Sequence, residues 1–249
     1  MVRGTLAEGP RARPLVVRGE RVAAVRDDPP VQGLELVIFD CDGVLVDSEV
    51  ISNDVLARML SAEGLPTTLM EARRDYQGLL LTEVLERAQE RLGRSLPGDW
   101  LARYERVRAE EFRRELRPVQ GAAEVVEGVL ARGVAVCVAS QGKLEKTRLS
   151  LDITGLRRLF PEHALFSAWS VPRGKPHPDL FLHAAAEMGA EPPSSVVVED
   201  TSSGVAAGVA AGMRVFGYAA DSDEQALRRA GATTFTSLER LPELLGLVS

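Results

Sequence analysis

Two aspartates one residue apart follow a short apolar run in the segment LVIFDCDGVLVDSE. Asp40 and Asp42 carry like charges, and each raises the pKa of the other unless a cation lies between them. Mg²⁺ suits such a site, because it takes one or two carboxylates with waters and phosphate oxygens in an octahedron. A carboxylate held by a metal stays ionised and can attack phosphorus, which makes Asp40 a candidate nucleophile that forms an aspartyl-phosphate.

Asp42 lies just past the apolar run, in a turn that Gly43 allows. From this position its carboxyl group can protonate the leaving oxygen and then take a proton from the hydrolytic water. Phosphoryl transfer otherwise needs positioning and charge neutralisation, so we expect further polar groups nearby. In the segment VASQGK, Ser140 and the backbone amide of Gln141 can donate to the phosphate oxygens.

Two later segments supply the remaining charges. Lys175, in RGKPHPD, can place a cation between the phosphate and Asp40, and Asp200, after VVVE, completes the metal ligands. Glu199 is expected to bind the metal directly or through water. Lysine is scarce, because the 30 basic residues include only the lysines at 143, 146 and 175. A lysine in a chain that otherwise uses arginine indicates a position that needs the compact charge of an ammonium rather than a planar guanidinium.

These residues follow runs that predict β-strands, and helical patterns alternate with the runs. That alternation is typical of a parallel sheet covered by helices, an α/β fold. Ligands of such sheets bind at the carboxyl ends of the strands, near the point where the strand order reverses. The expected strands are Leu36–Phe39, Val134–Ala139, Leu165–Ser167, Val196–Glu199 and Val215–Tyr218.

The interval between the first two strands is too long for one crossover helix. It predicts helices at Ile51–Glu63, Leu69–Tyr76, Thr82–Leu92 and Asp99–Leu116, and Ala122–Arg132 then leads into the second strand. We expect residues 35–50 and 119–249 to form the core and residues 51–118 a helical cap that covers the site. Residues 1–34 are expected to be an extension, flexible or with a hairpin at Pro14–Val25, and receive no function.

Composition narrows the class of protein. The 249 residues are 45% hydrophobic and 27% charged, enough for one substantial core with a smaller second domain. A net charge of −6 gives no excess of positive charge with which the protein could bind nucleic acid. No apolar run is long enough to span a bilayer. Cys41 and Cys137 lie within apolar runs and are expected to be packed free thiols, which fits a cytoplasmic protein.

Four ordered segments, DCDGVLVDSE, VASQGK, RGKPHPDLFLHAA and VVVEDTSSGVAAGVAAGM, resemble the four motifs of the haloacid dehalogenase superfamily. The similarity is to the phosphatase branch with β-phosphoglucomutase-like and sugar-phosphate phosphatase proteins. It implies a Rossmann-like core with helices on both faces, an α-helical cap inserted after the first strand, Mg²⁺ as cofactor and a small phosphorylated metabolite as partner. It also implies metal binding by Asp40, the Asp42 carbonyl and Asp200.

The resemblance points to a phosphatase for a sugar phosphate or sugar-acid phosphate, with several alternatives. Dehalogenases of this superfamily lack the second aspartate, and its phosphonatases need a cap lysine that residues 50–118 do not contain. Phosphomutases similar to β-phosphoglucomutase carry a histidine where this chain has Ser52. A mutase remains the second hypothesis, and a non-catalytic ligand-binding relative the third. The oligomeric state is left open.

Substrate recognition is expected from the cap and the turn before it. The segment YQGLLL resembles a cap segment whose glycine faces the active site, although its leucines depart from more polar versions. A solvated helix face is the competing interpretation for the arginines here. The candidate substrate-binding residues, beyond Ser140, Gln141 and Lys175, are Ser48, Arg73, Gln77 and Gly78.

Overall fold

The computed structural model describes residues 33–247. The hairpin expected at Pro14–Val25 lies outside these residues. The described residues form one six-stranded sheet in the order β3-β2-β1-β4-β5-β6, and every neighbouring pair is parallel. The strands are β1 (Leu36–Phe39), β2 (Ala135–Ser140), β3 (Leu165–Ser167), β4 (Ser195–Glu199), β5 (Arg214–Tyr218) and β6 (Thr233–Phe235). The predicted α/β fold with a Rossmann-like parallel sheet is confirmed.

Strand β6 was missed by the sequence prediction. It contains three residues, two of them threonines, so it carries little of the apolar pattern that marks the other strands. It extends the sheet beside β5, and Ala219, just past β5, donates its N–H to the carbonyl of Phe235 at 2.7 Å. Pairing with a neighbour therefore makes it a strand.

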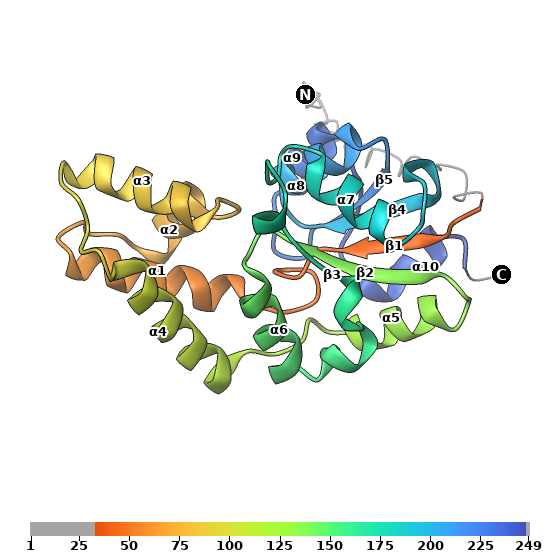
Figure 1. The fold of residues 1–249 in the computed structure, drawn as a ribbon, viewed down its shortest axis with the longest axis horizontal. Helices are drawn as coiled ribbons and strands as arrows, with labels where there is room; N and C mark the ends of the chain where they lie inside the picture. The colour runs from red at the N-terminus through yellow and green to blue at the C-terminus, as the bar shows by residue number, and fades with distance from the viewer. Residues whose placement is uncertain (1–32, 248–249) are drawn as a thin grey trace, which may run out of the picture.

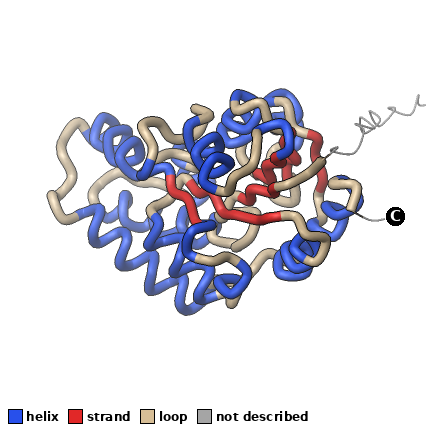
Figure 2. The backbone as a smooth tube through the Cα atoms, turned by 45° about the vertical axis from the view of Figure 1, so that its right-hand side comes forward, coloured by secondary structure: helices blue, strands red, loops and turns tan. Residues whose placement is uncertain are grey.

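Helices cover both faces of the sheet (Figures 1 and 2). Along β1, Val37 and Phe39 pack into the core on one face, and Leu36 and Ile38 into the core on the other. All four side chains are buried, as expected for a central parallel strand. The first face is covered by α5 (Ala122–Leu130), α6 (Leu144–Ile153) and α10 (Leu241–Leu244), and the second by α7 (Asp179–Glu187), α8 (Ser202–Ala210) and α9 (Glu224–Ala230).

Four helices between β1 and β2 form a separate body beside the sheet, on the left of Figure 1. They are α1 (Glu49–Ala62), α2 (Leu69–Tyr76), α3 (Leu81–Leu92) and α4 (Trp100–Glu115). These helices share a hydrophobic cluster of their own, which includes Leu60, Trp100 and Tyr104. The helices predicted from the sequence agree with them to within two residues at each end. We call this body the cap, and its division from the core at residues 50 and 118 remains our interpretation.

The two connections between the cap and the core run side by side. Asp47 donates its N–H to the carbonyl of Arg117, and Val119 donates to the carbonyl of Leu45, both at 3.0 Å. The outgoing and returning chains are thus hydrogen-bonded to each other where the cap joins the core.

Helix α8 lies close to the sheet, because two of its glycines leave room for neighbouring side chains. A Cβ atom on Gly208 would lie 2.6 Å from Val215 Cγ2, and one on Gly204 would lie 1.8 Å from Glu199 Oε1. Glycine is therefore required at both positions by close approach. The prediction of free, packed thiols is also confirmed, since Cys41 and Cys137 are buried and unbonded. Within residues 33–247, no helix combines the length and apolar character needed to cross a membrane.

Candidate active site

The predicted reactive residues meet where the strand order reverses. The chain passes from β1 to β2 on one side and later returns to place β4 on the other side of β1. Phe39, the last residue of β1, is in register with Val138 of β2 and Val198 of β4. Because of this register, Asp40 and Asp200, which follow β1 and β4, come together at one edge of the sheet. This is the position where open α/β sheets bind ligands.

Lys175 connects two of the carboxylates. Its Nζ atom lies 2.5 Å from Asp40 Oδ1 and 2.6 Å from Glu199 Oε1, and it also donates to the carbonyl of Ala139 at 3.0 Å. All three charged side chains are buried. Burial alone would lower the pKa of Lys175, but the two carboxylates raise it above its ordinary value. Lys175 is therefore a permanent cation beside Asp40.

Glu199 differs from its predicted role as a metal ligand. Its Oε1 atom accepts from Lys175, and its Oε2 atom accepts from the backbone N–H groups of Asp200 and Thr201 and from the Thr201 hydroxyl, at 2.9–3.0 Å. Both oxygens are therefore occupied by protein donors. We assign Glu199 to the positioning of Lys175 and of the turn that carries Asp200, in place of direct metal binding. The reason is that Gly204 lets α8 close over this carboxylate.

The side chain of Gln141 holds the loop that carries Lys175. Its amide donates to the carbonyl of Lys175 at 3.3 Å and accepts from the Lys175 N–H at 3.0 Å. A Cβ on the preceding Gly174 would lie 2.9 Å from this amide, so a larger residue there would displace the Gln141 side chain. From the sequence, Gln141 was expected to bind phosphate through its backbone amide. The structure adds a contact between the second and third motifs.

Asp42 has a partner that was not predicted from the sequence. Its Oδ1 atom accepts from both the Ser48 hydroxyl and the Lys146 ammonium. Burial alone would raise the pKa of Asp42, but Lys146, Ser48 and Arg108 together lower it below its ordinary value. Ser48 is 1% exposed and was expected to bind substrate. The structure directs its hydroxyl to Asp42, so we assign it to the positioning of that carboxylate.

The pKa values of Asp200 and Asp40 are raised, whereas that of Asp42 is lowered. Burial raises the pKa of Asp200 well above its ordinary value, with further contributions from Glu199, Glu49 and Asp40. Burial also raises the pKa of Asp40 to about 7, although Lys175 opposes the change. Among the described residues, Asp200 Oδ1 is buried and has no hydrogen-bond partner. Asp200 is therefore a buried carboxylate with an uncommitted oxygen, and the pKa of Asp40 stays raised despite its contact with Lys175.

The donors fit Mg²⁺. Gly43 has a φ of +74° and leaves space for the Asp200 carboxylate, because a Cβ there would lie 2.2 Å from Asp200 Oδ2. Within residues 33–247, no three His, Cys, Asp or Glu side chains form a ready-made metal site. Mg²⁺ needs no such cage, since it is commonly held by one or two carboxylates and completed by waters and phosphate. The uncommitted Asp200 oxygen beside Asp40 is a suitable donor for it.

A single cleft between cap and core collects most of the predicted residues. Gln77 and Gly78 of the cap line it, and a Cβ on Gly78 would lie 3.5 Å from the Ser203 hydroxyl at the start of α8. The predicted residues that line the cleft are Asp40, Asp42, Gln77, Gly78, Gln141, Lys175, Glu199 and Asp200, whereas Ser48, Arg73 and Ser140 do not.

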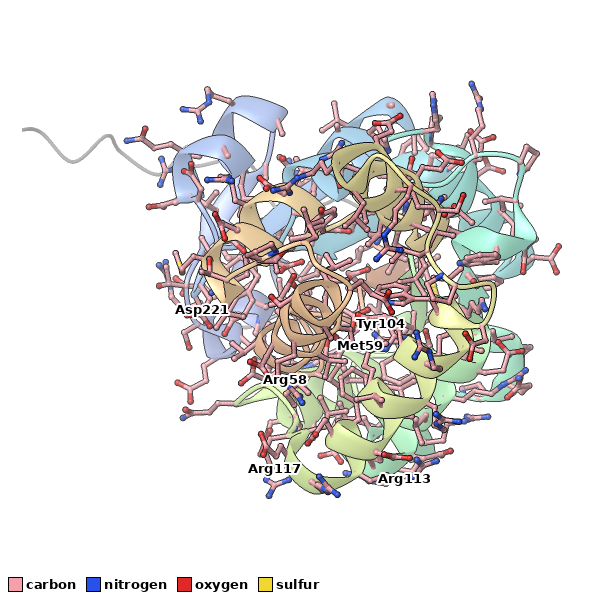
Figure 3. All side chains as sticks on the ribbon, turned by 90° about the vertical axis from the view of Figure 1, so that its left-hand side faces the viewer. Arg58, Met59, Tyr104, Arg113, Arg117 and Asp221 are labelled. Carbon is pink, nitrogen blue, oxygen red and sulfur yellow. The ribbon has the colours of Figure 1, made fainter. Side chains whose placement is uncertain are left out.

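Arg73 and Ser140 lie beside the cleft for different reasons. Arg73 of α2 donates to the backbone carbonyl of Asp221 at 3.3 Å, and it lines hollows that adjoin the cleft and share Gln77 and Asp200 with it. Figure 3 labels Asp221, which lies to one side of the cap in that view. Ser140 is fully buried at the end of β2, and its hydroxyl oxygen accepts from the N–H of Gly142 at 3.0 Å. Ser140 thus shapes the turn that begins the second motif.

The lining residues that were not found from the sequence include Glu49, Arg108, Lys146 and Trp169. The scarcity of lysine that singled out Lys175 applied equally to Lys146 and was the available signal. Arg108 lies among many arginines of α4, and nothing in its spacing marked it. Trp169 is 45% exposed, and the Nζ atom of Lys143 lies 5.1 Å from the centroid of its ring. The core therefore contributes an aromatic side chain to the wall of the cleft.

Comparison with known proteins places these features in context. The haloacid dehalogenase-like hydrolase family matches residues 37–218. The chain is 33% identical to 6-phosphogluconate phosphatase of Escherichia coli over 212 residues, 85% of this chain and 94% of that protein. It is 32% identical to hexitol phosphatase B of the same species, over 71% of this chain and 80% of that one. A crystal structure of a hydrolase of this family from Deinococcus radiodurans, with bound phosphate and sodium, is 32% identical with a TM-score of 0.71, over 87% of this chain and 98% of that one.

Proposed function

Because this chain belongs to the haloacid dehalogenase-like hydrolase family and is a phosphoric monoester hydrolase, we propose that it is a Mg²⁺-dependent phosphatase of small phosphorylated carbohydrates. The substrates are sugar phosphates or sugar-acid phosphates, which is supported by the two E. coli relatives, a 6-phosphogluconate phosphatase and a hexitol phosphatase. The observation that carries the proposal is the bond between Lys175 and Asp40 Oδ1, at 2.5 Å, beside the uncommitted carboxylate of Asp200.

Asp40 is the nucleophile. Lys175 binds its Oδ1 atom, which orients the carboxylate and leaves the Oδ2 atom to attack phosphorus. The aspartyl-phosphate that forms is an acyl phosphate, and its hydrolysis returns the free carboxylate. Because Lys175 is held by Glu199 and by the clamp of Gln141, its charge stays in place during both steps. A fixed cation stabilises the charge of the transferred group without reorganisation.

Asp42 is the acid and base. In its protonated form it gives its proton to the departing sugar oxygen, and as a carboxylate it then takes a proton from the attacking water. Lys146 and Ser48 hold one of its oxygens, which fixes the side chain toward the cleft. Ser140 accepts from the Gly142 N–H and so positions the turn, which presents the backbone amide of Gln141 to the phosphate oxygens.

Asp40, the Asp42 carbonyl and Asp200 would hold the Mg²⁺. When bound, this ion neutralises the phosphate and keeps both aspartates ionised, which removes the electrostatic conflict that raises their pKa values. The cap excludes bulk water while the phosphoryl group is transferred. Its cleft residues Gln77 and Gly78 contact the sugar.

The test is phosphate release with Mg²⁺ from a panel of phosphorylated sugars, hexitols and sugar acids, comparing wild type with Asp40→Asn. We expect metal-dependent release that the variant lacks. The panel includes β-glucose 1-phosphate with product identification, because Ser52 lines the cleft where a mutase carries histidine. Conversion to glucose 6-phosphate without release would contradict hydrolysis, and binding without turnover would indicate a non-catalytic relative.

A further inference from the structure

The cations of the cleft have carboxylate partners, with one exception. Lys175 contacts Asp40 and Glu199, Lys146 contacts Asp42, and Lys143 pairs with Glu105 at 2.6 Å. The fourth cation that lines the cleft is Arg108 of α4. Among residues 33–247, no carboxylate forms an ion pair with its guanidinium. The cap therefore presents one uncommitted positive charge to the substrate.

Arg108 is held in place by aromatic rings. Its guanidinium lies 5.0 Å from the centroid of the Tyr104 ring and 5.9 Å from that of Phe112. Tyr104, labelled in Figure 3, stacks on Trp100 at 5.8 Å, and its hydroxyl donates to the carbonyl of Ser52 on α1 at 3.3 Å. Cation–π contacts such as these orient a guanidinium, and a side-chain hydrogen bond to Tyr104 holds it further, which leaves its other N–H donors for a ligand. Arg108 is thus preorganised on the cap wall of the cleft.

We propose that Arg108 binds a carboxylate at the end of the substrate remote from the reacting phosphate, so that the preferred substrate is a phosphorylated sugar acid. This inference rests on the proposed function. A guanidinium fork matches a planar carboxylate with two parallel hydrogen bonds. A second phosphate group would bring a dianion, and the cleft offers one uncommitted cation to meet it. A neutral hydroxymethyl group in the same place would leave that cation without a partner.

The experiment uses two substrates that differ at one carbon. Gluconate 6-phosphate carries a carboxylate at C1, whereas glucitol 6-phosphate carries a hydroxymethyl group there. We expect wild type to favour the first by about ten- to a hundredfold in kcat/KM, the range of a charge-assisted pair. Arg108→Gln removes most of this preference, and Arg108→Lys keeps part of it, because lysine retains the charge without the fork. The ratio of the two substrates cancels general damage to the enzyme.

Arg106→Gln is the matched control. Arg106 lies on the same helix two residues away, is exposed, and does not line the cleft. We expect this variant to keep the preference of wild type to within about twofold, as is usual for a surface substitution. An equal loss in both variants would show that net charge, rather than contact with Arg108, sets the preference, and would overturn the inference.

Two further arms separate the remaining outcomes. Fructose 1,6-bisphosphate tests a second phosphate: if it surpasses gluconate 6-phosphate in wild type and loses this advantage in Arg108→Gln, the carboxylate assignment is wrong. Calorimetry of the binding of gluconate 6-phosphate and of glucitol 6-phosphate to the Asp40→Asn protein tests recognition without turnover. Absence of phosphate release from every substrate contradicts the proposed function alone, whereas equal binding of the two ligands contradicts the role of Arg108.

Discussion

The ammonium of Lys146 contacts the carboxylate of Asp42, the proposed acid and base. The two residues are 104 positions apart in the chain, and the lysine comes from the first turn of α6. This contact explains why the pKa of Asp42 is lowered despite burial, while that of Asp40 is raised to about 7. Two aspartates one residue apart thus have pKa values displaced in opposite directions in the metal-free protein.

Lys146→Met should move the pH dependence of turnover. Without the lysine, the pKa of Asp42 rises, so a higher pH is needed for the carboxylate that accepts a proton from water. We expect the acid limb of the kcat profile to move to higher pH. Lys143→Met removes a charge from the same cleft without contact to Asp42. Identical profiles for the two variants would contradict a specific role for Lys146.

Metal binding should stabilise the fold more strongly as the pH rises. In the metal-free protein the pKa of Asp40 is raised from 3.8 to about 7, so between these values the folded state holds a proton that the unfolded state has released. The free energy of unfolding therefore falls as the pH rises from about 4 to about 7, with a slope of at most about 1.4 kcal/mol for each increase of one in pH. Mg²⁺ opposes this loss by favouring the ionised carboxylates.

The measurement is the unfolding temperature with and without Mg²⁺ at several pH values. We expect a small increase near pH 5 and a larger one near pH 7.5. Asp200→Asn should lose most of the increase at the higher pH, because its free carboxylate oxygen is the proposed donor. An increase that does not change with pH, or that persists in this variant, would argue against a metal at these two aspartates.

Replacing Lys175 should destabilise the protein as well as inactivate it. Lys175→Met leaves Asp40 and Glu199 buried without their cation, and breaking a buried ion pair in this way costs about 3–5 kcal/mol. Adding Glu199→Gln removes one of the two orphaned charges, so we expect the double variant to regain part of the stability and none of the activity. Chemical denaturation of wild type, the two single variants and the double variant measures this, and strictly additive losses would contradict the coupling.

The close packing of α8 on the sheet gives a fourth prediction. Gly208→Ala places a methyl group 2.6 Å from Val215 Cγ2, and we expect it to lower the free energy of unfolding by about 1–3 kcal/mol. Gly128→Ala in α5 is the matched control, since no atom lies within 4 Å of its added Cβ. We expect that variant to gain about 0.5–1 kcal/mol from helix propensity. Equal effects from the two substitutions would contradict close packing as the reason for Gly208.

Much of the fold could be predicted because its signals are local. The apolar runs before Asp40 and Glu199 are strands buried on both faces, and such strands are continuous in sequence. The helices of the cap have periodic patterns and were located to within two residues. Strand β6 was missed because three residues carry no period, and only its pairing with β5 defines it.

The sequence by itself determined the reactive edge of this protein: Asp40, Asp42, Lys175 and Asp200 each follow an apolar run or a motif that marks a strand end. Which polar atoms then meet was decided by the tertiary structure alone. Lys146 on Asp42, both oxygens of Glu199 on protein donors, and Arg108 without a carboxylate among the described residues are all outcomes of how distant segments meet. Such contacts depend on how helices pack on the sheet and how the cap lies over it, and no local pattern encodes them.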